Sequence, residues 1–161
     1  MKIDKDELKE LVRIGYEKNL VHIIYADALK DDGCEGIACR IGSNCFYFAG
    51  ETGEEFKNIY DYIRNTTKEE NINNITETIL SLNKDRFKDE AGYYYYFLKN
   101  RTENIYKALQ LWHELEDIPI NEEDEIDTPW RNFPKGTPRE NIWHWFEDTY
   151  QVSIVNDLMG N

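Results

Sequence analysis

Residues 37–49, IACRIGSNCFYFA, decide the fold class, because two short β-prone runs flank the turn residues Gly42, Ser43 and Asn44. This pattern predicts a β-hairpin. Pairing Ile41 with Phe46 gives one face made of Ile37, Cys39, Ile41, Phe46 and Phe48, and an opposite face made of Arg40, Cys45 and Tyr47. We therefore expect Cys39 to point into the core and Cys45 to point toward solvent.

The chain before the hairpin is typical of a helix followed by a strand. Asp4 and Glu7 have the spacing of a capping box, and apolar residues at i, i+3 and i+4 follow as far as about Lys18. Asn19 suits the helix exit. The run LVHIIYA, residues 20–26, predicts a strand that is buried on both faces.

Two helices are expected after the hairpin. Thr52 with Glu55 forms a capping box before an apolar stripe over residues 56–63, and Thr67 with Glu70 repeats this pattern before a stripe over residues 72–82. The connection between these helices is short.

The aromatic run Tyr93–Leu98 has β-propensity without decisive periodicity, so it predicts a fourth strand, with helical continuation as the competing interpretation. Thr102 is then expected to cap a helix that places Ile105, Ala108, Leu109, Trp112 and Leu115 inward and ends before Pro119. Together these elements predict one α+β domain over residues 1–161: a short antiparallel sheet with a central hairpin, packed by amphipathic helices.

The charge of the chain limits its partners. A net charge of -13 repels nucleic acid and anionic membranes, whereas 40% hydrophobic residues are enough for a folded core. No run of eighteen apolar residues occurs, and the first ten residues are charged throughout. We therefore expect a cytoplasmic protein whose partners are basic or neutral, without direct nucleic-acid or membrane binding.

Short catalytic signatures are absent. Cys34, Cys39 and Cys45 form no CxxC pair, and the sequence contains no HExxH, phosphate loop or nucleophile elbow. We expect no metal and no cofactor. A thiol with a nearby histidine is the remaining catalytic option, and Cys34 or Cys45 would be the nucleophile, because Cys39 is expected to be buried.

Residues from Glu114 to Asp127 include eight carboxylates and no lysine or arginine, and Pro119 disfavours a continuous helix. We expect an acidic loop at about 116–127, either as a partner-binding surface or as a solvated loop fixed by its isoleucines. Its candidate partner-binding residues are Glu114, Glu116, Asp117, Glu122, Glu123, Asp124, Glu125 and Asp127.

The stretch TPWRNFPKGTPRENIWHWF, residues 128–146, leads into the last helix. Thr137, Pro138 and Glu140 have the pattern of a helix start, with Thr137 as N-cap. Ile142, Trp145 and Phe146 are expected to face the core. Arg139 and Trp143 stand at i, i+4 on another face, where they are expected to stack and to contact a partner, although aromatic density is more often ordinary core. His144 is expected at the surface, and Ser153 is expected to start a short turn toward Met159.

The box FPKGTPRENIWHWF, residues 133–146, resembles a C-terminal box of small uncharacterised acidic proteins of intestinal bacteria, which are associated with phage or conjugative elements. The resemblance implies a genomic setting in which such proteins inhibit a host defence enzyme or neutralise a toxin. It implies no catalytic residue.

These observations predict a non-catalytic acidic protein-binding module, an inhibitor of the anti-restriction or anti-CRISPR kind that occupies a basic surface of a nuclease. The alternatives are a toxin immunity protein, or a cysteine-dependent enzyme that uses Cys34 or Cys45.

Overall fold

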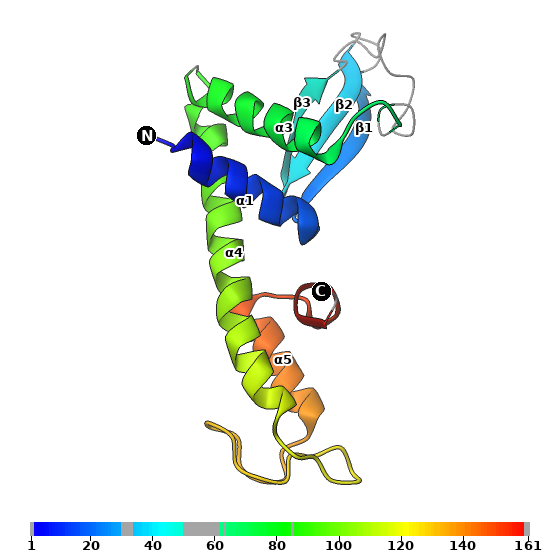
Figure 1. Cartoon of the computed structure of the whole chain (residues 1–161), viewed down its shortest axis with the longest axis vertical. Helices are drawn as coiled ribbons and strands as arrows, with labels where there is room; N and C mark the ends of the chain where they lie inside the picture. Colours follow the sequence, from blue (N-terminus) through cyan, green and yellow to red (C-terminus); the bar gives the residue numbers. More distant parts are fainter. Residues whose placement is uncertain (1, 30–33, 50–61, 63, 85, 160–161) are drawn as a thin grey trace. The chain divides into compact units, whose positions relative to one another are not determined.

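The fold is α+β, with a three-stranded antiparallel sheet and several helices packed against it. The computed structural model describes residues 2–29, 34–49, 62, 64–84 and 86–159 (Figure 1). Contacts divide the chain into two compact units, Met1–Asn100 and Arg101–Asn161. The expectation of one domain stays a prediction. The elements follow in the order α1 (Lys5–Glu17), β1 (Val21–Leu29), β2 (Cys34–Ile41), β3 (Asn44–Ala49), α3 (Lys68–Asn83), α4 (Lys88–Glu116), α5 (Arg139–Tyr150) and η2, a short π-helix (Ile154–Met159).

The predicted hairpin is formed by β2 and β3, and β1 pairs with the other side of β2. The expected register is wrong by two residues: Ile41 pairs with Asn44, and Cys39 pairs with Phe46. A shift by two residues leaves each side chain on its expected face. Cys39 is therefore buried and Cys45 exposed, as predicted. The side chain of Phe48 lies outside the described residues.

The hairpin turn is shorter than the sequence suggested, because only Gly42 and Ser43 separate the two strands. Gly42 has φ 66°, which fits the first position of a glycine-first two-residue turn. A side chain at Gly42 would also collide with the Tyr93 hydroxyl and approach the Phe97 ring to 3.1 Å. Both backbone conformation and close packing therefore require glycine here.

The first helix has the predicted cap and exit, but Glu7 contacts Tyr95 of α4 instead of completing the predicted capping box. Asp4 caps α1 by accepting a hydrogen bond from the backbone N–H of Asp6, and Asn19 takes the left-handed conformation just after the helix, with φ 60°. The Glu7 carboxylate accepts a hydrogen bond from the Tyr95 hydroxyl of α4. The prediction that β1 is buried on both faces is wrong, because β1 is an edge strand on which His22, Ile23 and Ile24 are only half-buried.

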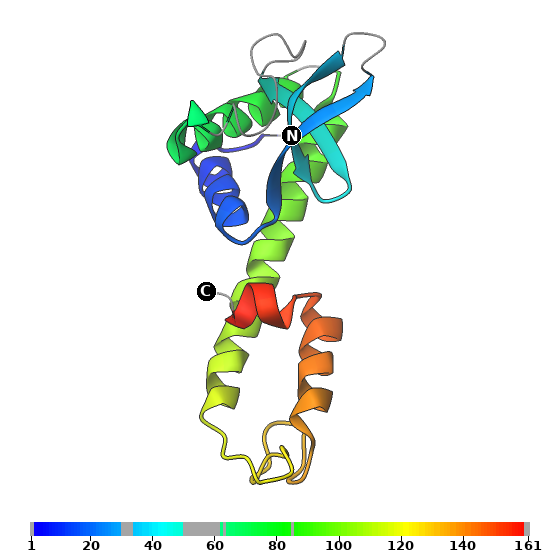
Figure 2. The same cartoon turned by 90° about the vertical axis from the view of Figure 1, so that its right-hand side faces the viewer.

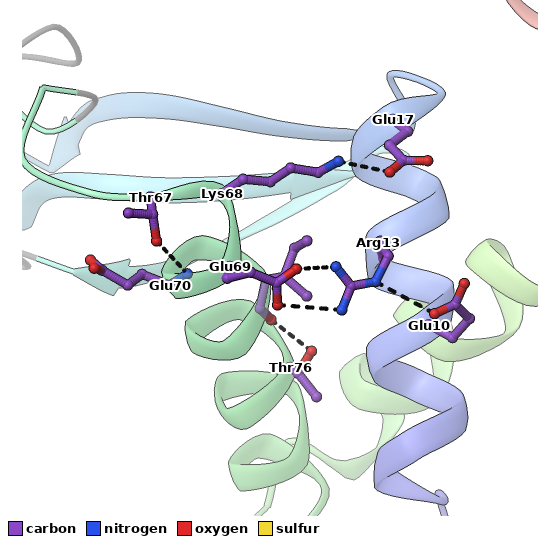
Figure 3. A network of polar contacts seen from close by, with 9 residues as sticks. Glu10, Arg13, Glu17, Thr67, Lys68, Glu69, Glu70 and Thr76 are labelled. Carbon is purple, nitrogen blue, oxygen red and sulfur yellow. Dashed lines mark hydrogen bonds and ion pairs between the residues drawn. The ribbon is translucent and has the colours of Figure 1, made fainter. Parts of the chain in front are cut away.

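Helices α1 and α3 lie side by side in the first unit (Figures 1 and 2). Thr67 caps α3, as predicted, by accepting a hydrogen bond from the backbone N–H of Glu70 at 3.1 Å. Charged pairs link the exposed sides of the two helices, including Lys68 with Glu17 at 2.7 Å (Figure 3). The helix expected over residues 56–63, with its cap at Thr52 and Glu55, lies almost entirely outside the described residues.

The prediction of a strand at Tyr93–Leu98 is wrong, because this run lies within the long helix α4. The buried side chains Ala91, Tyr94, Tyr95 and Leu98 follow the i, i+3, i+4, i+7 spacing of one helix face. This face packs on the hairpin and on α1, and the Phe46 and Tyr94 ring centroids are 5.0 Å apart. The predicted cap at Thr102 is also wrong, since Thr102 is buried in the interior of α4.

In the second unit, the end of α4 and the helix α5 run in opposite directions, joined by the acidic loop and residues 128–138 (Figure 2). Trp112 of α4 packs against Phe146 of α5 with ring centroids 5.5 Å apart. Ile142 and Phe146 are buried, as predicted, and Trp145 is half-buried. The predicted cap at Thr137 is wrong: α5 starts one residue later, because the Thr137 hydroxyl donates to the carbonyl of Pro134 and Pro138 takes the cap position in an extended conformation.

Candidate functional site

The acidic run begins in the last turns of α4 and continues as an ordered loop. The Oδ1 of Asn121 accepts hydrogen bonds from the backbone N–H groups of Glu123 and Glu125, at 2.9 and 3.0 Å. This local side-chain bonding is typical of asparagine-stabilised turns. Asp124, between the two bonded residues, adopts φ 63°, and its carbonyl accepts a hydrogen bond from the backbone N–H of Arg139 at 3.0 Å. The loop therefore holds Asp124 at the start of α5.

One isoleucine fixes this loop to the protein. Ile126 is fully buried, and its backbone exchanges hydrogen bonds with Gly136 and Thr137 at 2.9 and 3.0 Å. Ile120 forms a β-bridge with Ile126, yet its side chain is 43% exposed. The interpretation of a loop fixed by its isoleucines is thus confirmed for the buried side chain of Ile126, whereas Ile120 contributes its backbone bridge and leaves its side chain exposed.

Arg139 and Trp143 stack as predicted. The Arg139 Cζ lies 5.6 Å from the centroid of the Trp143 ring, and its Nε donates a hydrogen bond to the Asp124 Oδ1 at 2.8 Å. Trp143 is half-buried and lies against Trp112, with ring centroids 5.8 Å apart. Asp124, Arg139 and Trp143 therefore form a carboxylate, guanidinium and indole stack at the surface of the second unit.

The same arrangement occurs again in this unit. Arg131 Cζ lies 5.7 Å from the Trp130 ring centroid, and an Arg131 guanidinium nitrogen donates to the Glu114 carboxylate at 2.8 Å. The second unit thus holds an arginine between a carboxylate and a tryptophan ring at two separate places.

Two adjoining cavities flank the stack, because both have Arg139 and Trp143 in their walls. The first has a volume of about 290 Å³ and is completed by Asp124, Glu140, His144 and Glu147. The second has a volume of about 180 Å³ and is completed by Trp112, Leu115, Glu116, Ile118, Pro119 and Ile120. The first cavity therefore has three carboxylates in its wall beside the Trp143 ring, and the wall of its neighbour is mostly made of apolar side chains.

Three polar residues of the first cavity come from one exposed face of α5. His144 Nδ1 lies 3.2 Å from the Glu147 carboxylate and its Nε2 lies 3.6 Å from Glu140, so a protonated imidazole would form ion pairs with both. Sequence reasoning assigned Glu140 to a helix cap and missed Glu147, although residues 140, 144 and 147 have the i, i+4, i+7 spacing that would have shown them on one face.

The cavities contain only some of the predicted partner-binding residues. Glu116, Asp124, Arg139 and Trp143 line one or both of them. Glu114 pairs with Arg131 instead. The remaining predicted carboxylates line neither cavity and form no ion pair within the described part of the chain: Asp117, Glu122, Glu123, Glu125 and Asp127.

The structure describes the side chains of two of the three cysteines, Cys39 and Cys45. Burial raises the pKa of the Cys39 thiol, which keeps that thiol protonated. Cys45 is exposed. In the register of the sheet it lies opposite Arg40 of β2, and Arg40 lies opposite His22 of β1. Two strand spacings, roughly 9–10 Å, thus separate the backbones of Cys45 and His22. Cys34 begins β2, but its side chain lies outside the described residues.

Among the residues that the structure describes, no group of three or more His, Cys, Asp or Glu side chains is placed to hold a metal ion. Within the same residues, no helix is both long and apolar enough to cross a membrane. Comparisons of the chain with protein-family models, with curated proteins and with solved structures find no match.

Proposed function

We propose that this protein is a non-catalytic acidic binding module, which occupies a basic surface of another protein through the face of its second unit around Trp143. The observation that carries the proposal is the grouping of Asp124, Glu140 and Glu147 around a cavity with an aromatic wall. Aromatic side chains that remain half-exposed beside charged groups are typical anchors of protein interfaces. The rest of the acidic loop attracts a basic partner from a distance.

The class of partner that we propose is a basic protein of host defence, such as a nuclease, which an inhibitor encoded on a mobile element would neutralise. The net charge of -13 supports this proposal, because surfaces that bind nucleic acid are positively charged and attract an acidic protein of this size. The resemblance of residues 133–146 to proteins associated with mobile elements supports the same setting.

The test uses a partner captured from host lysate at low salt, purified and measured against matched variants. The cavity variant Asp124→Asn/Glu140→Gln/Glu147→Gln removes three carboxylates that line the cavity. The control variant Asp117→Asn/Glu122→Gln/Glu123→Gln removes the same charge from the acidic loop beside it. We expect the cavity variant to weaken binding at least tenfold, about 1.4 kcal/mol, and the control to weaken it less than threefold.

Salt is the second arm of this test. Raising the ionic strength from about 0.1 M to about 1 M shortens the Debye length from ~10 Å to ~3 Å. The affinity of the wild-type protein for the captured partner should therefore fall. Equal losses in the two variants would show that only net charge matters. A failure to capture any partner in a salt-sensitive manner would contradict the proposal as a whole.

A further inference from the structure

The two adjoining cavities allow the chemistry of the partner's anchoring side chains to be specified, an inference that rests on the proposed function. The first cavity has three carboxylates in its wall, Asp124, Glu140 and Glu147, and one guanidinium, that of Arg139. Two negative charges therefore remain when His144 is neutral. The side chains of Glu140 and Glu147 are 81% and 44% exposed, so an incoming group can reach them. The occupant that this wall favours is a cation.

The size of the first cavity accommodates a single side chain. Cavities that enclose a drug-sized ligand have volumes of roughly 300–1,000 Å³, and this one, at about 290 Å³, is at the lower limit. A single amino-acid side chain delivered by a partner protein fits this volume.

The protein itself shows which cation suits these surroundings. Arg139 lies between Asp124 and Trp143, and Arg131 lies between Glu114 and Trp130. A guanidinium is flat, is weakly hydrated and offers several donors in one plane, so it can stack on an indole and bind a carboxylate together. A lysine ammonium is a compact, strongly hydrated charge that cannot do both equally well.

The neighbouring cavity requires an apolar side chain next to the cation. Its wall includes Trp112, Leu115, Ile118 and Ile120, and Ile120 is 43% exposed. Its volume of about 180 Å³ is smaller than that of the first cavity. Filling it removes apolar surface from water on both partners. Because the cavities share Arg139 and Trp143, the two anchors must be close together on the partner.

We infer that the site recognises a paired anchor on its protein partner, in which an arginine enters the cavity beside Glu140 and Glu147 and an adjacent leucine-sized apolar side chain enters the cavity beside Trp112. Arg139 and Trp143 form the wall between the two anchors and contact both.

The test follows the indole N–H signals of the four tryptophans by NMR while capped peptides are added to the full chain. The probes are acetyl-Gly-Leu-Arg-Gly-amide, the same peptide with lysine in place of arginine, and the same peptide with glycine in place of leucine. We expect the first peptide to shift the Trp112 and Trp143 signals with saturation, and to bind at least fivefold more tightly than either of the others. The Trp145 signal, from outside both cavities, is the internal reference.

Two exposed substitutions keep the test independent of folding. Glu147→Gln should weaken binding of the arginine peptide at least threefold, whereas Glu103→Gln, at an exposed position of α4 that lines neither cavity, should leave the affinity for this peptide unchanged. Equal binding of the arginine and lysine peptides, shifts of all four indoles alike, or no saturable shift would overturn the inference. If the peptides do not bind, but the triple cavity variant still binds the captured partner more weakly than wild type, the proposed function stands and only the paired anchor is wrong.

Discussion

Arg13 of α1 and Glu69 of α3 make a two-point contact, in which both terminal guanidinium nitrogens face the two carboxylate oxygens (Figure 3). The second of these contacts is 3.3 Å long. Arg13 also lies 3.5 Å from Glu10 of its own helix, so the guanidinium bridges two carboxylates. Paired geometry of this kind is the most directional form of surface ion pair.

The ion pairs between α1 and α3 predict that acid weakens the packing of these helices. Hydrogen bonds from Lys68, Arg13 and Lys5 hold the pKa values of Glu17, Glu69 and Glu77 below their ordinary value of 4.5. A lowered carboxyl pKa contributes stability that is complete above 4.5 and is lost as the pH falls through the folded-state pKa. We therefore expect the thermal unfolding midpoint to fall on acidification below that value.

Glu69→Gln isolates the strongest of these contacts. It should lower the unfolding midpoint near neutral pH and show little difference from wild type once the pH has fallen below the lowered pKa. Glu70→Gln is the matched control, because Glu70 lies in the same first turn of α3. Equal effects of the two substitutions at neutral pH would show that the helix end, rather than the contact with Arg13, is responsible.

Neighbouring tyrosines of α4 should respond in opposite ways to loss of their hydroxyl. The Tyr93 hydroxyl accepts a hydrogen bond from the backbone N–H of Ser43 at 3.0 Å, and Tyr93→Phe should cost about 0.5–1.5 kcal/mol. The Tyr94 hydroxyl is buried without a hydrogen-bond partner among the described residues, so Tyr94→Phe should be neutral or stabilising. Urea unfolding of both variants measures the difference, and a larger loss for Tyr94→Phe would contradict this account.

Arg101 connects α4 to the C-terminal segment. Its guanidinium donates to the carbonyl of Gln151 and lies 3.7 Å from the carboxylate of Asp157, which is only 4% exposed. Arg101→Met should leave that buried carboxylate without its cation and cost about 1–3 kcal/mol. Lys107→Met, at an exposed position of the same helix, is the control. Limited proteolysis should cleave η2 faster in the Arg101→Met variant than in the Lys107→Met variant. Equal cleavage rates in the two variants would show that Arg101 does not hold the C-terminal segment.

The two isoleucines that bridge the acidic loop should differ in importance. Ile126→Ala creates a cavity at a fully buried position and should cost about 2–5 kcal/mol. Ile120→Ala, at a position that is 43% exposed, should change the free energy of unfolding by less than about 1 kcal/mol. Because Ile120 lines the apolar cavity, its substitution should instead weaken the binding of the peptide that carries leucine. Similar losses of stability in the Ile126→Ala and Ile120→Ala variants would show that burial of Ile126 is not what fixes the loop.

Local patterns were enough to predict several features correctly. The caps at Asp4 and Thr67, the inward Cys39 and the outward Cys45 follow from interactions within a few residues, or from the alternation of a strand. The stacking of Arg139 on Trp143 is of the same kind, because four residues along a helix bring two side chains together whatever surrounds them.

Other features depended on partners that are distant in the sequence. Tyr93–Leu98 forms a helix because the hairpin and α1 cover the stripe that includes Tyr94 and Leu98, and a short aromatic run has no periodicity that could reveal this. The start of α5 moved by one residue because the Thr137 hydroxyl binds the carbonyl of Pro134 instead of the helix end.

The sequence by itself determined the α+β class, the charge, and the local pairs on which the candidate site is built, because these depend on composition and on short spacings. Only the tertiary structure decided which carboxylates line the two cavities. It brought Asp124 of the loop beside Glu140 and Glu147 of α5 and left Glu122 and Glu123 outside both cavities. The physical reason is that the turn at Asn121, the burial of Ile126 and the bond from Arg139 together fix the loop, and no spacing within the acidic run specifies all three.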